Sequence, residues 1–412
     1  MHFLYKQHRT KLCTMLPWLV LITLPWAHTQ GLQHSLAALL LITISWPVEV
    51  RIKPVLRSAL LFGLIALVTS LQKMGTHLFP LAIKELFWSF LVPLAGFACA
   101  ATLDVRQNRA MQAISMVLTL IFVLFITGAA LFWSRMGVIT GESASGFWRF
   151  YPGPGISSTL LLLSMPLVLT GLGDHQPLLM RLSRHHWALL ALLATTWGGW
   201  LTGNREFWLG WMLVLLVTLH ALSRRKRHGQ LLLLITAILG FSLAVGMIRH
   251  QTHVRTDLHG FATITHDNRL IIWQYWLKQI PNAPWMGHGY GKAVQRAYYR
   301  QDQHLQNPVG IQVLIGTHAH NVLLDTWIQT GLFGVLGWLL LQWKLAHPIE
   351  VDPSIRQAAS LLVVLMLLKN ATDDFMDFQV PLFYCLQLGL IWSSRRPTDP
   401  APDHPKAQQA QA

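Results

Sequence analysis

Residues 317–343 read THAHNVLLDTWIQTGLFGVLGWLLLQW, in which two histidines precede a long apolar run. The run is long enough to cross a bilayer, and it predicts a membrane-spanning helix over 321–343. A polar segment, residues 249–320, ends where this helix begins. The pattern therefore places the imidazoles of His318 and His320 at the edge of a membrane.

The rest of the chain repeats such apolar runs. Of its 412 residues, 53% are hydrophobic and 12% are charged, and the mean hydropathy is +0.41. A soluble protein carries roughly twice that charged fraction. We therefore predict an all-α polytopic membrane protein with about twelve spans. The spans are expected near 12–28, 32–48, 56–72, 84–103, 110–133, 156–173, 186–202, 206–222, 230–248, 321–343, 355–372 and 379–394.

The net charge of +15 could indicate nucleic-acid binding, but the basic residues are scattered between the spans and form no domain-sized patch. Short cytoplasmic loops of membrane proteins collect Lys and Arg, whereas long loops cross regardless of charge. With the N-terminus inside, 19 of the 32 Lys and Arg fall in inside segments, 6 in short outside connections and 7 in the long loop. Both termini are therefore predicted to be cytoplasmic. Arg205, the loop 249–320, His320 and the pair Asp373-Asp374 then share the outer, periplasmic face.

A single transmembrane domain is expected over residues 1–394. The basic start of the chain resembles a signal peptide, but Pro25-Trp26-Ala27 does not fit a cleavage site, so we expect an uncleaved first helix. The tail 395–412 is rich in Pro, Ala, Gln and Asp, which predicts a disordered cytoplasmic end. The three cysteines lie in apolar segments and indicate neither a disulfide framework nor a cysteine metal site.

The histidine segment has three interpretations. His320 precedes Asn321, which is suited to cap the following helix. At an interface with access to water, a mostly neutral histidine suits a general base. The commoner case for a lone histidine is an interfacial side chain bonded to a backbone carbonyl. A metal site that includes His318 is the third interpretation, although the spacing indicates no third ligand.

Two arginines fall on the predicted outer face. Arg205 lies in a tight connection between two apolar spans, where it either binds an anion or extends its charge to water; the adjacent Glu206 could also pair with it. Arg269 lies in the first turn of a predicted amphipathic interfacial helix, which Asp267 or Asn268 could cap. There it either binds phosphate together with the helix N-terminus or is simply solvated. The apolar residues of this helix recur at helical spacing: Leu270, Trp273, Leu277 and Ile280.

Two further segments complete the predicted outer face. The alternating glycines of segment 284–291 predict a turn that returns the long loop to the membrane. Asp373, Asp374 and Asp377 lie where the eleventh predicted span ends. They either cap and solvate a helix end, or orient His320 or Arg269, or bind a divalent metal.

Together these motifs resemble the O-antigen ligase family, within the wider group that shares the polymerase-ligase C-terminal domain. His320-Asn321, nine residues and then Gly331-x-x-Gly334 fit the histidine motif of that family in full. Residues 269–291 resemble the start of its large periplasmic loop. Arg205 resembles the arginine that the family carries at the outer end of an earlier span.

The resemblance implies a membrane glycosyltransferase of GT-C-like architecture, surrounded by membrane lipids. The donor would be O-polysaccharide on undecaprenyl pyrophosphate, and the acceptor a sugar hydroxyl of lipid A-core. His320 would act as general base, and Arg205 and Arg269 would bind the pyrophosphate. Further expected substrate contacts are His318, Asn321 and Asp374. We expect direct displacement with inversion, on the periplasmic face of a Gram-negative inner membrane, without a metal or other cofactor.

Other functions fit the same pattern. An O-antigen polymerase has the same size and topology. A protein O-oligosaccharyltransferase usually has a larger C-terminal periplasmic region, whereas only a short tail follows the last predicted span here. From another class, a membrane transporter commonly shows inverted repeats and charged residues near the bilayer midplane, and no internal repeat is evident.

Overall fold

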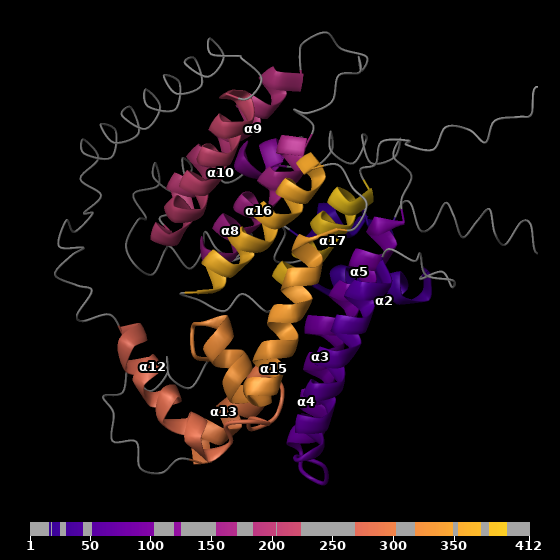
Figure 1. Cartoon of the computed structure of the whole chain (residues 1–412), viewed down its shortest axis with the longest axis vertical. Helices are drawn as coiled ribbons and strands as arrows, with labels where there is room; N and C mark the ends of the chain where they lie inside the picture. Colours follow the sequence, from indigo (N-terminus) through magenta and orange to yellow (C-terminus); the bar gives the residue numbers. More distant parts are fainter. Residues whose placement is uncertain are drawn as a thin grey trace, which may run out of the picture.

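The computed structural model describes residues 16–17, 19–24, 30–43, 52–102, 119–124, 154–170, 184–202, 204–223, 268–301, 318–348, 353–371 and 379–393. Every described element is a helix, which confirms the all-α prediction for this part of the chain (Figure 1). The elements are α2 (Gln30–Thr43), α3 (Lys53–Leu71), α4 (Leu78–Leu86), the π-helix η3 (Phe87–Leu91), α5 (Val92–Ala101), α8 (Pro154–Thr170), α9 (Arg184–Thr202), α10 (Arg205–Ser223), α12 (Asn268–Gln279), the 3-10 helix η7 (Ile280–Asn282), α13 (Lys292–Gln301), α15 (Val322–Ala346), α16 (Pro353–Asn370) and α17 (Gln379–Ser393).

Within the described residues, three stretches of helix are long and apolar enough to cross a membrane: Lys53–Leu71, Leu78–Ala101 and Val322–Ala346. Two shorter apolar helices cover Gly155–Leu169 and Phe207–Thr218. Nine of the predicted spans overlap described helices. The predicted span 230–248 and the predicted tail 395–412 lie outside the described residues. The number of twelve spans therefore stays a prediction.

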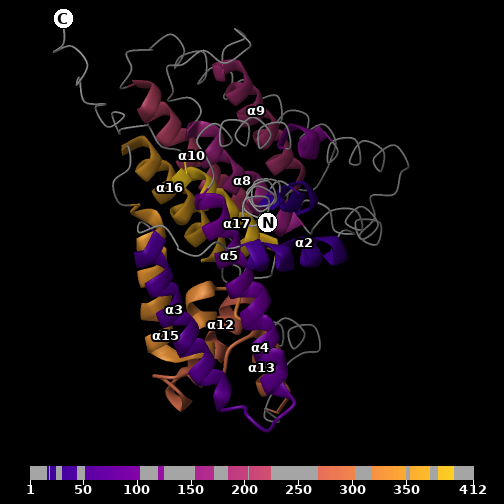
Figure 2. The ribbon, with the colours of Figure 1, turned by 90° about the vertical axis from the view of Figure 1, so that its right-hand side faces the viewer.

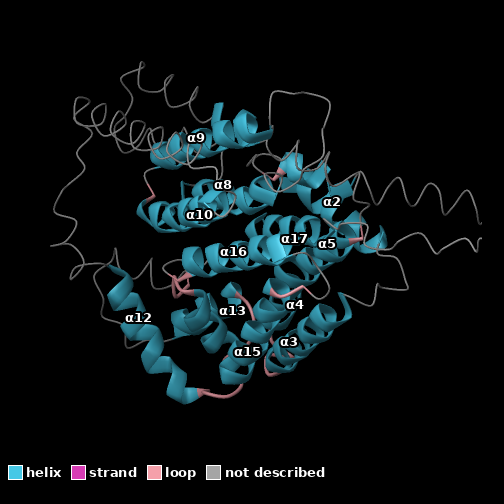
Figure 3. Cartoon of the chain, turned by 45° about the horizontal axis from the view of Figure 1, so that its top comes forward, coloured by secondary structure: helices cyan, strands magenta, loops and turns pink. Residues whose placement is uncertain are grey.

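The helices form two neighbouring groups. In Figure 1, α8, α9, α10 and α16 occupy the upper part, whereas α12 and α13 lie in the lower part with the ends of α3 and α4. Figure 2 shows α3 beside α15, and α13 beside α4. In Figure 3, where the top of the molecule is tilted forward, α16 and α17 lie between the α9–α10 pair and the α3–α15 pair. The long spans α3 and α15 thus run into the group that holds α12 and α13.

Small residues allow the spans to approach each other closely, as is common between helices in membranes. Where α17 packs on α5, a Cβ atom added to Gly389 would lie 2.6 Å from the Cβ atom of Ala100. Where α15 packs on α3, a Cβ atom added to Gly337 would lie 3.3 Å from Cδ1 of Ile65. The helix positions are therefore set by close backbone packing at glycines.

The surface of the long spans suits a hydrocarbon environment. On α3, Leu60 and Leu64 are 68% and 58% exposed, and on α15 Leu336 and Trp343 are 56% and 59% exposed. These side chains recur at helical spacing, and contiguous exposed apolar patches mark membrane or protein contacts. Together with the apolar length of the helices, this surface is that of a membrane protein.

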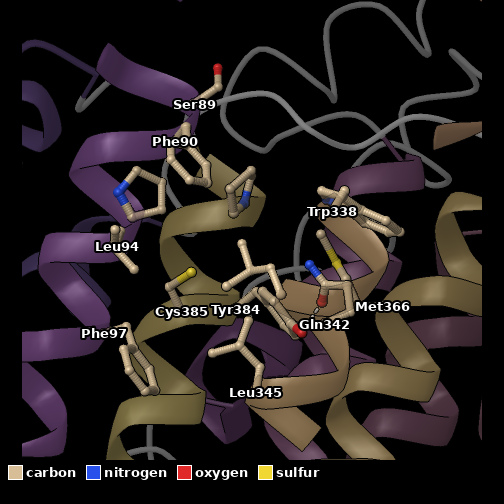
Figure 4. A pocket seen from close by; sticks show the side chains of 13 residues that line it. Ser89, Phe90, Leu94, Phe97, Trp338, Gln342, Leu345, Met366, Tyr384 and Cys385 are labelled. Atoms are coloured by element: carbon tan, nitrogen blue, oxygen red, sulfur yellow. Dashed lines mark hydrogen bonds between the residues drawn. The ribbon is translucent and has the colours of Figure 1, made fainter. Parts of the chain in front are cut away.

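A mostly apolar pocket lies between η3, α5, α15, α16 and α17 (Figure 4). Its empty space, together with the open solvent at its mouth, is about 520 Å³. Inside it, the Tyr384 hydroxyl donates a hydrogen bond of 2.6 Å to Oε1 of Gln342. Its lining includes Trp338 and Leu345 but no residue of the histidine segment.

Candidate functional site

The histidine segment leads into α15, and α15 is broken at Gly331. Gly331 has φ 68° and ψ −172°, so α15 consists of two helical halves. The predicted span over 321–343 is therefore a helix with a break at Gly331, and the sequence pattern did not predict that break. A left-handed backbone of this kind suits glycine, because a residue with a Cβ atom would be strained there.

The glycine-rich loop 283–291 bonds to the backbone groups that the break leaves open. Loop N–H groups donate to the last carbonyls of the first half of α15, and loop carbonyls accept from the second half and from Trp327. The bonds are His288 N to Ile328 O (2.7 Å), Gly289 N to Gln329 O (3.0 Å), Leu332 N to Pro284 O (2.9 Å) and Trp327 Nε1 to Pro284 O (3.1 Å). The predicted turn thus docks its backbone directly on the break.

Two glycines make this close docking possible, and a third makes room inside the bend of α15. A Cβ atom at Gly331 would overlap the carbonyl group of Trp285, and one at Gly287 would lie 2.5 Å from the α15 backbone. A Cβ atom at Gly334 would overlap the Thr330 side chain. The two glycines of the Gly331-x-x-Gly334 motif therefore serve the bend and its contact with the loop.

The two imidazoles lie together in the turn before α15. The ring centroids of His318 and His320 are 3.9 Å apart, with an interplanar angle of 37°. His320 has φ 52°, and among the described residues no other non-glycine residue has a positive φ. For an L-amino acid that conformation costs roughly 1–2 kcal/mol. Both rings are half-buried, and Nε2 of His320 is shielded from solvent, so the expected access to water does not extend to that atom.

Asn321 joins this turn to two helices. Its Oδ1 accepts from the N–H of Leu324 at 2.9 Å, which confirms the predicted N-cap of α15. Its Nδ2 donates to the carbonyl oxygen of Ala371 at 2.7 Å. The turn with the histidines therefore lies against the C-terminal end of α16.

A hydrogen-bonded network holds the turn from the other side. Oδ1 of the buried Asp325 accepts from the N–H of Ala319 and from Nε2 of Gln295, both at 2.7 Å. Gln329 then links Gln295 to the loop: its Nε2 donates to Gln295 at 3.3 Å, and its Oε1 accepts from the N–H of Gly291 at 2.9 Å. The segment between the histidines is thereby tied to α13.

Helix α13 is in turn fixed to α4. Oε1 of Glu85 accepts from the N–H of Ala293 at 2.9 Å, in the first turn of α13. A carboxylate at that position stabilises a helix N-terminus. Beside it, Val294 of α13 packs against Leu78 and Ala82 of α4. A long apolar helix therefore anchors the network that reaches the histidines.

Arg269 is half-buried in the first turn of α12, which begins at Asn268; Asp267 lies outside the described residues. The opposite end of α12 leads into the loop at the break of α15. Along α12, Ile272, Tyr275 and Trp276 pack in one cluster with Ala319, Leu324 and Ile328. The start of α12 is thus directed toward the histidine end of α15. In the predicted apolar stripe, Leu270 and Leu277 are exposed, and Trp273 and Ile280 are half-buried.

Arg205 is the first residue of α10, and the packing of α8, α9 and α16 determines its position in the molecule. Helix α9 runs antiparallel to α8, because Thr195 contacts Met165 while Gly198 lies against Leu161. The end of α9, and with it the start of α10, therefore lies beside the N-terminal end of α8.

That end of α8 is also the histidine end of the molecule. Nζ of Lys369 donates to Oγ of Ser158 at 3.4 Å, so the C-terminal end of α16 meets the N-terminal end of α8. Two residues further, Ala371 accepts the bond from Asn321. Arg205 thus begins a helix at the same end of the bundle as His320. A meeting of its guanidinium with His320 and Arg269 stays a prediction.

The predicted aspartates Asp373, Asp374 and Asp377 lie outside the described residues. Among the residues that are described, no group of three or more His, Cys, Asp or Glu side chains could hold a metal ion. The interpretations of the aspartate cluster therefore stay open.

The docked loop carries a histidine of its own. His288 is half-buried, with Nε2 3.3 Å from the carbonyl oxygen of Gln279 and its ring 4.4 Å from that of Tyr298. Burial lowers the pKa of His288 below its ordinary value of 6.5, and the Lys73 ammonium lowers it as well, against the opposite effect of the Gln279 carbonyl. The loop is therefore built around a neutral imidazole.

Residues 178–339 match the family model described as O-antigen ligase. This segment belongs to the O-antigen ligase family. The match includes Arg205, Arg269, His320, Gly331 and Gly334, so the O-antigen ligase segment contains the whole arrangement from α9 to the bend of α15. A search among curated proteins finds no match to the chain.

Three residues of the O-antigen ligase segment that hold the histidine turn were not predicted from the sequence: Gln295, Asp325 and Gln329. For Asp325 a signal was present, because a single carboxylate inside an apolar helical run is rare and is usually functional. The two glutamines give no such signal, because their partners come from distant parts of the chain.

Proposed function

We propose that this protein is an O-antigen ligase, which transfers O-polysaccharide from undecaprenyl pyrophosphate to a sugar hydroxyl of lipid A-core. The observation that carries the proposal is the family match over residues 178–339, which includes a histidine turn held from both sides. The reaction takes place at the periplasmic face of a Gram-negative inner membrane, with both chain termini in the cytoplasm.

In this proposal His320 is the general base. The anomeric carbon of the donor already carries a diphosphate leaving group, so the acceptor hydroxyl must be deprotonated as it attacks. The imidazole of His320 takes that proton while the new glycosidic C–O bond forms and the C–O bond to the diphosphate breaks. Direct displacement inverts the anomeric centre. His318, in ring contact with His320, shapes the same surface.

Arg205 and Arg269 stabilise the charge of the departing diphosphate. Guanidinium groups hold phosphate oxygens in paired hydrogen bonds, and such contacts are stronger at a partly dehydrated interface than in water. Both arginines lie in the first turn of a helix, whose free N–H groups add to the attraction for an anion. Asn321 and Asp374 complete the proposed substrate contacts, and no metal or other cofactor takes part.

Helix α12 brings this chemistry to the lipid. Leu270 and Leu277, 38% and 53% exposed, lie on the side of α12 away from its buried contacts. A helix with one apolar side exposed and aromatic residues along it is suited to lie in the membrane interface. The diphosphate of a carrier lipid would then lie at the depth of Arg269.

The decisive experiment is in-vitro transfer with the purified protein, carrier-linked glycan and core lipid, with and without a chelator. We expect glycosylated core lipid in both conditions. His320→Ala should lower the rate roughly 100-fold or more, the usual contribution of a general base, while the protein still inserts in the membrane. His347→Ala is the matched control, because His347 lies at the other end of α15, stacked on Trp343.

The products separate the related activities. Near-normal transfer by His320→Ala removes this residue from the mechanism, and activity that depends on a divalent metal contradicts the metal-independent chemistry. Growth of the carrier-linked glycan, with the core lipid left unmodified, identifies a polymerase instead.

A further inference from the structure

Asp325 is a buried carboxylate that the proposed chemistry does not use. It is 2% exposed and lies in the first half of α15. Burial of a carboxylate is strongly unfavourable unless hydrogen bonds compensate for the lost water. Oδ1 of Asp325 receives two such bonds, from the N–H of Ala319 and from Nε2 of Gln295, both at 2.7 Å.

The bond to Ala319 is not an ordinary helix cap. Asn321 already caps α15, through the N–H of Leu324. Asp325 instead reaches back six residues, to a backbone N–H that lies before the helix and between the two histidines. Ala319 is 0% exposed, so this N–H has no access to solvent. The carboxylate therefore holds the middle of the histidine segment.

The same bond acts on the strained residue next to it. His320 has φ 52°, a conformation that persists only when its surroundings hold it in place. Asn321 holds the chain after His320 through Ala371, and Asp325 holds the chain before it through Ala319. These two attachments hold the backbone from which the His320 ring projects.

We propose that Asp325 is a positioning residue for His320: it fixes Ala319 and thereby aims the imidazole at the acceptor hydroxyl. This inference rests on the proposed function of His320 as general base. Gln295 connects Asp325 to α13. The imidazole is thereby held in position relative to α13 as well as to α15. A displacement of a catalytic group by about 1 Å can cost roughly 100-fold in rate, so such an anchor has a large effect.

The test compares Asp325→Leu and Asp325→Asn in purified protein in nanodiscs. Leucine has no acceptor, whereas the amide oxygen of asparagine can still accept from Ala319. We expect Asp325→Leu to lower kcat about 30-fold or more, with the KM for the carrier-linked donor within about threefold of wild type. The Ala319 amide should exchange with deuterium about tenfold faster. Asp325→Asn should recover kcat to within about fivefold of wild type.

Thr326→Val is the matched control. Thr326 follows Asp325 in the same helix, is buried, and donates only within that helix, to the carbonyl oxygen of Val322 at 2.6 Å. Its loss removes a buried hydrogen bond without touching Ala319, so kcat should stay within about threefold of wild type. A loss in Thr326→Val equal to that in Asp325→Leu overturns the proposal, because loosening of the helix would then explain both.

Three other results overturn it: Asp325→Leu with near-normal kcat, an unchanged exchange rate of Ala319, or Asp325→Asn as slow as Asp325→Leu. If Asp325→Leu does not fold, Asp325→Glu replaces it. The additional methylene moves the carboxylate away from Ala319, so kcat should fall about tenfold, and wild-type kcat in Asp325→Glu counts against the proposal. If wild-type protein transfers no glycan, the proposed function fails, while the exchange measurement still tests the hold on Ala319.

Discussion

At the scale of single residues, His320 carries its imidazole on a strained backbone with φ 52°. Strained residues cluster at functional sites, where the surrounding structure holds them in place. Here the holding groups are the side chains of Asn321 and Asp325, on either side of the turn. A rigid turn of this kind gives an imidazole one direction, which is what proton transfer to a general base requires.

The proposed role of Arg269 depends on the planar shape of its side chain as well as on its charge. Arg269→Lys keeps the positive charge at the start of α12 but loses the planar fork that binds two phosphate oxygens. We expect a loss of about 10-fold or more in transfer rate, measured with carrier-linked glycan and core lipid. Lys278→Arg, at the far end of the same helix, is the control and should leave the rate unchanged. Full activity in Arg269→Lys indicates a merely solvated side chain.

His288 predicts a dependence of stability on pH. Burial lowers its pKa in the folded protein below the value of 6.5 for an exposed histidine, so protons bind more readily to the unfolded chain. The stability that the neutral ring contributes is complete above pH 6.5 and is lost as the pH falls through 6.5 and below. The thermal midpoint of the purified protein should therefore decrease between about pH 7.5 and about pH 5.

Two variants of this loop check the origin of that decrease. His288→Phe keeps a ring against Tyr298 but cannot be protonated, so its midpoint should decrease less steeply with pH. Lys73→Met removes the ammonium that also lowers the pKa of His288, and should likewise make the dependence shallower. An unchanged slope in His288→Phe assigns the decrease to other groups.

At the scale of elements, the bend of α15 depends on Gly331. Gly331→Ala would force a Cβ atom into the carbonyl group of Trp285 and strain a backbone with φ 68°. We expect a loss of about 3 kcal/mol or more in stability, seen as a low yield of monodisperse protein in detergent. Gly337→Ala, in the second half of the same helix, should cost less than about 1 kcal/mol, because the nearest contact of its Cβ atom is the flexible end of Ile65 at 3.3 Å and the Phe62 atoms lie at ordinary contact distance. Equal losses in the two variants contradict this account of the bend.

Elements with local causes could be predicted from the sequence, and those with distant partners could not. Asn321 caps α15 through a residue three positions away, and its role was predicted correctly. The bend at Gly331 needs the backbone of residues 283–291, so the motif marked the glycine but not the break. Asp325 acts through Ala319 and α13, and an apolar helical pattern carries no information about either contact.

At the scale of the whole molecule, the apolar runs predicted helices because a span must be apolar along its length. The same runs do not specify which helices become neighbours, since lipid and protein are equally apolar surroundings. Packing of α5 on α17 depends on Gly389 opposite Ala100, a match of small residues that neither run contains alone. The grouping of the helices therefore had to come from the structure.

The predicted orientation can be tested by labelling of cysteines from one side. In a variant without the three native cysteines, Thr76→Cys reports on the turn between α3 and α4, which borders the loop 283–291 through Lys73 and Gly289. An impermeant maleimide should label this position in intact spheroplasts, because loop and turn are predicted to face the periplasm. Arg356→Cys, exposed near the start of α16, should be labelled only after permeabilisation. The reverse pattern contradicts the placement of both termini in the cytoplasm.

The bent form of α15 also bears on biosynthesis. Backbone polar groups without hydrogen-bond partners are costly in hydrocarbon. The loop 283–291 must therefore be in place as soon as the bend of α15 enters the membrane. Residues 283–291 leave the ribosome before Gly331, and in the proposed orientation they are translocated before α15 reaches the insertion machinery. A nascent chain whose loop stays behind in the cytosol has nothing with which to close the bend, and would present an open helix end to quality-control proteases.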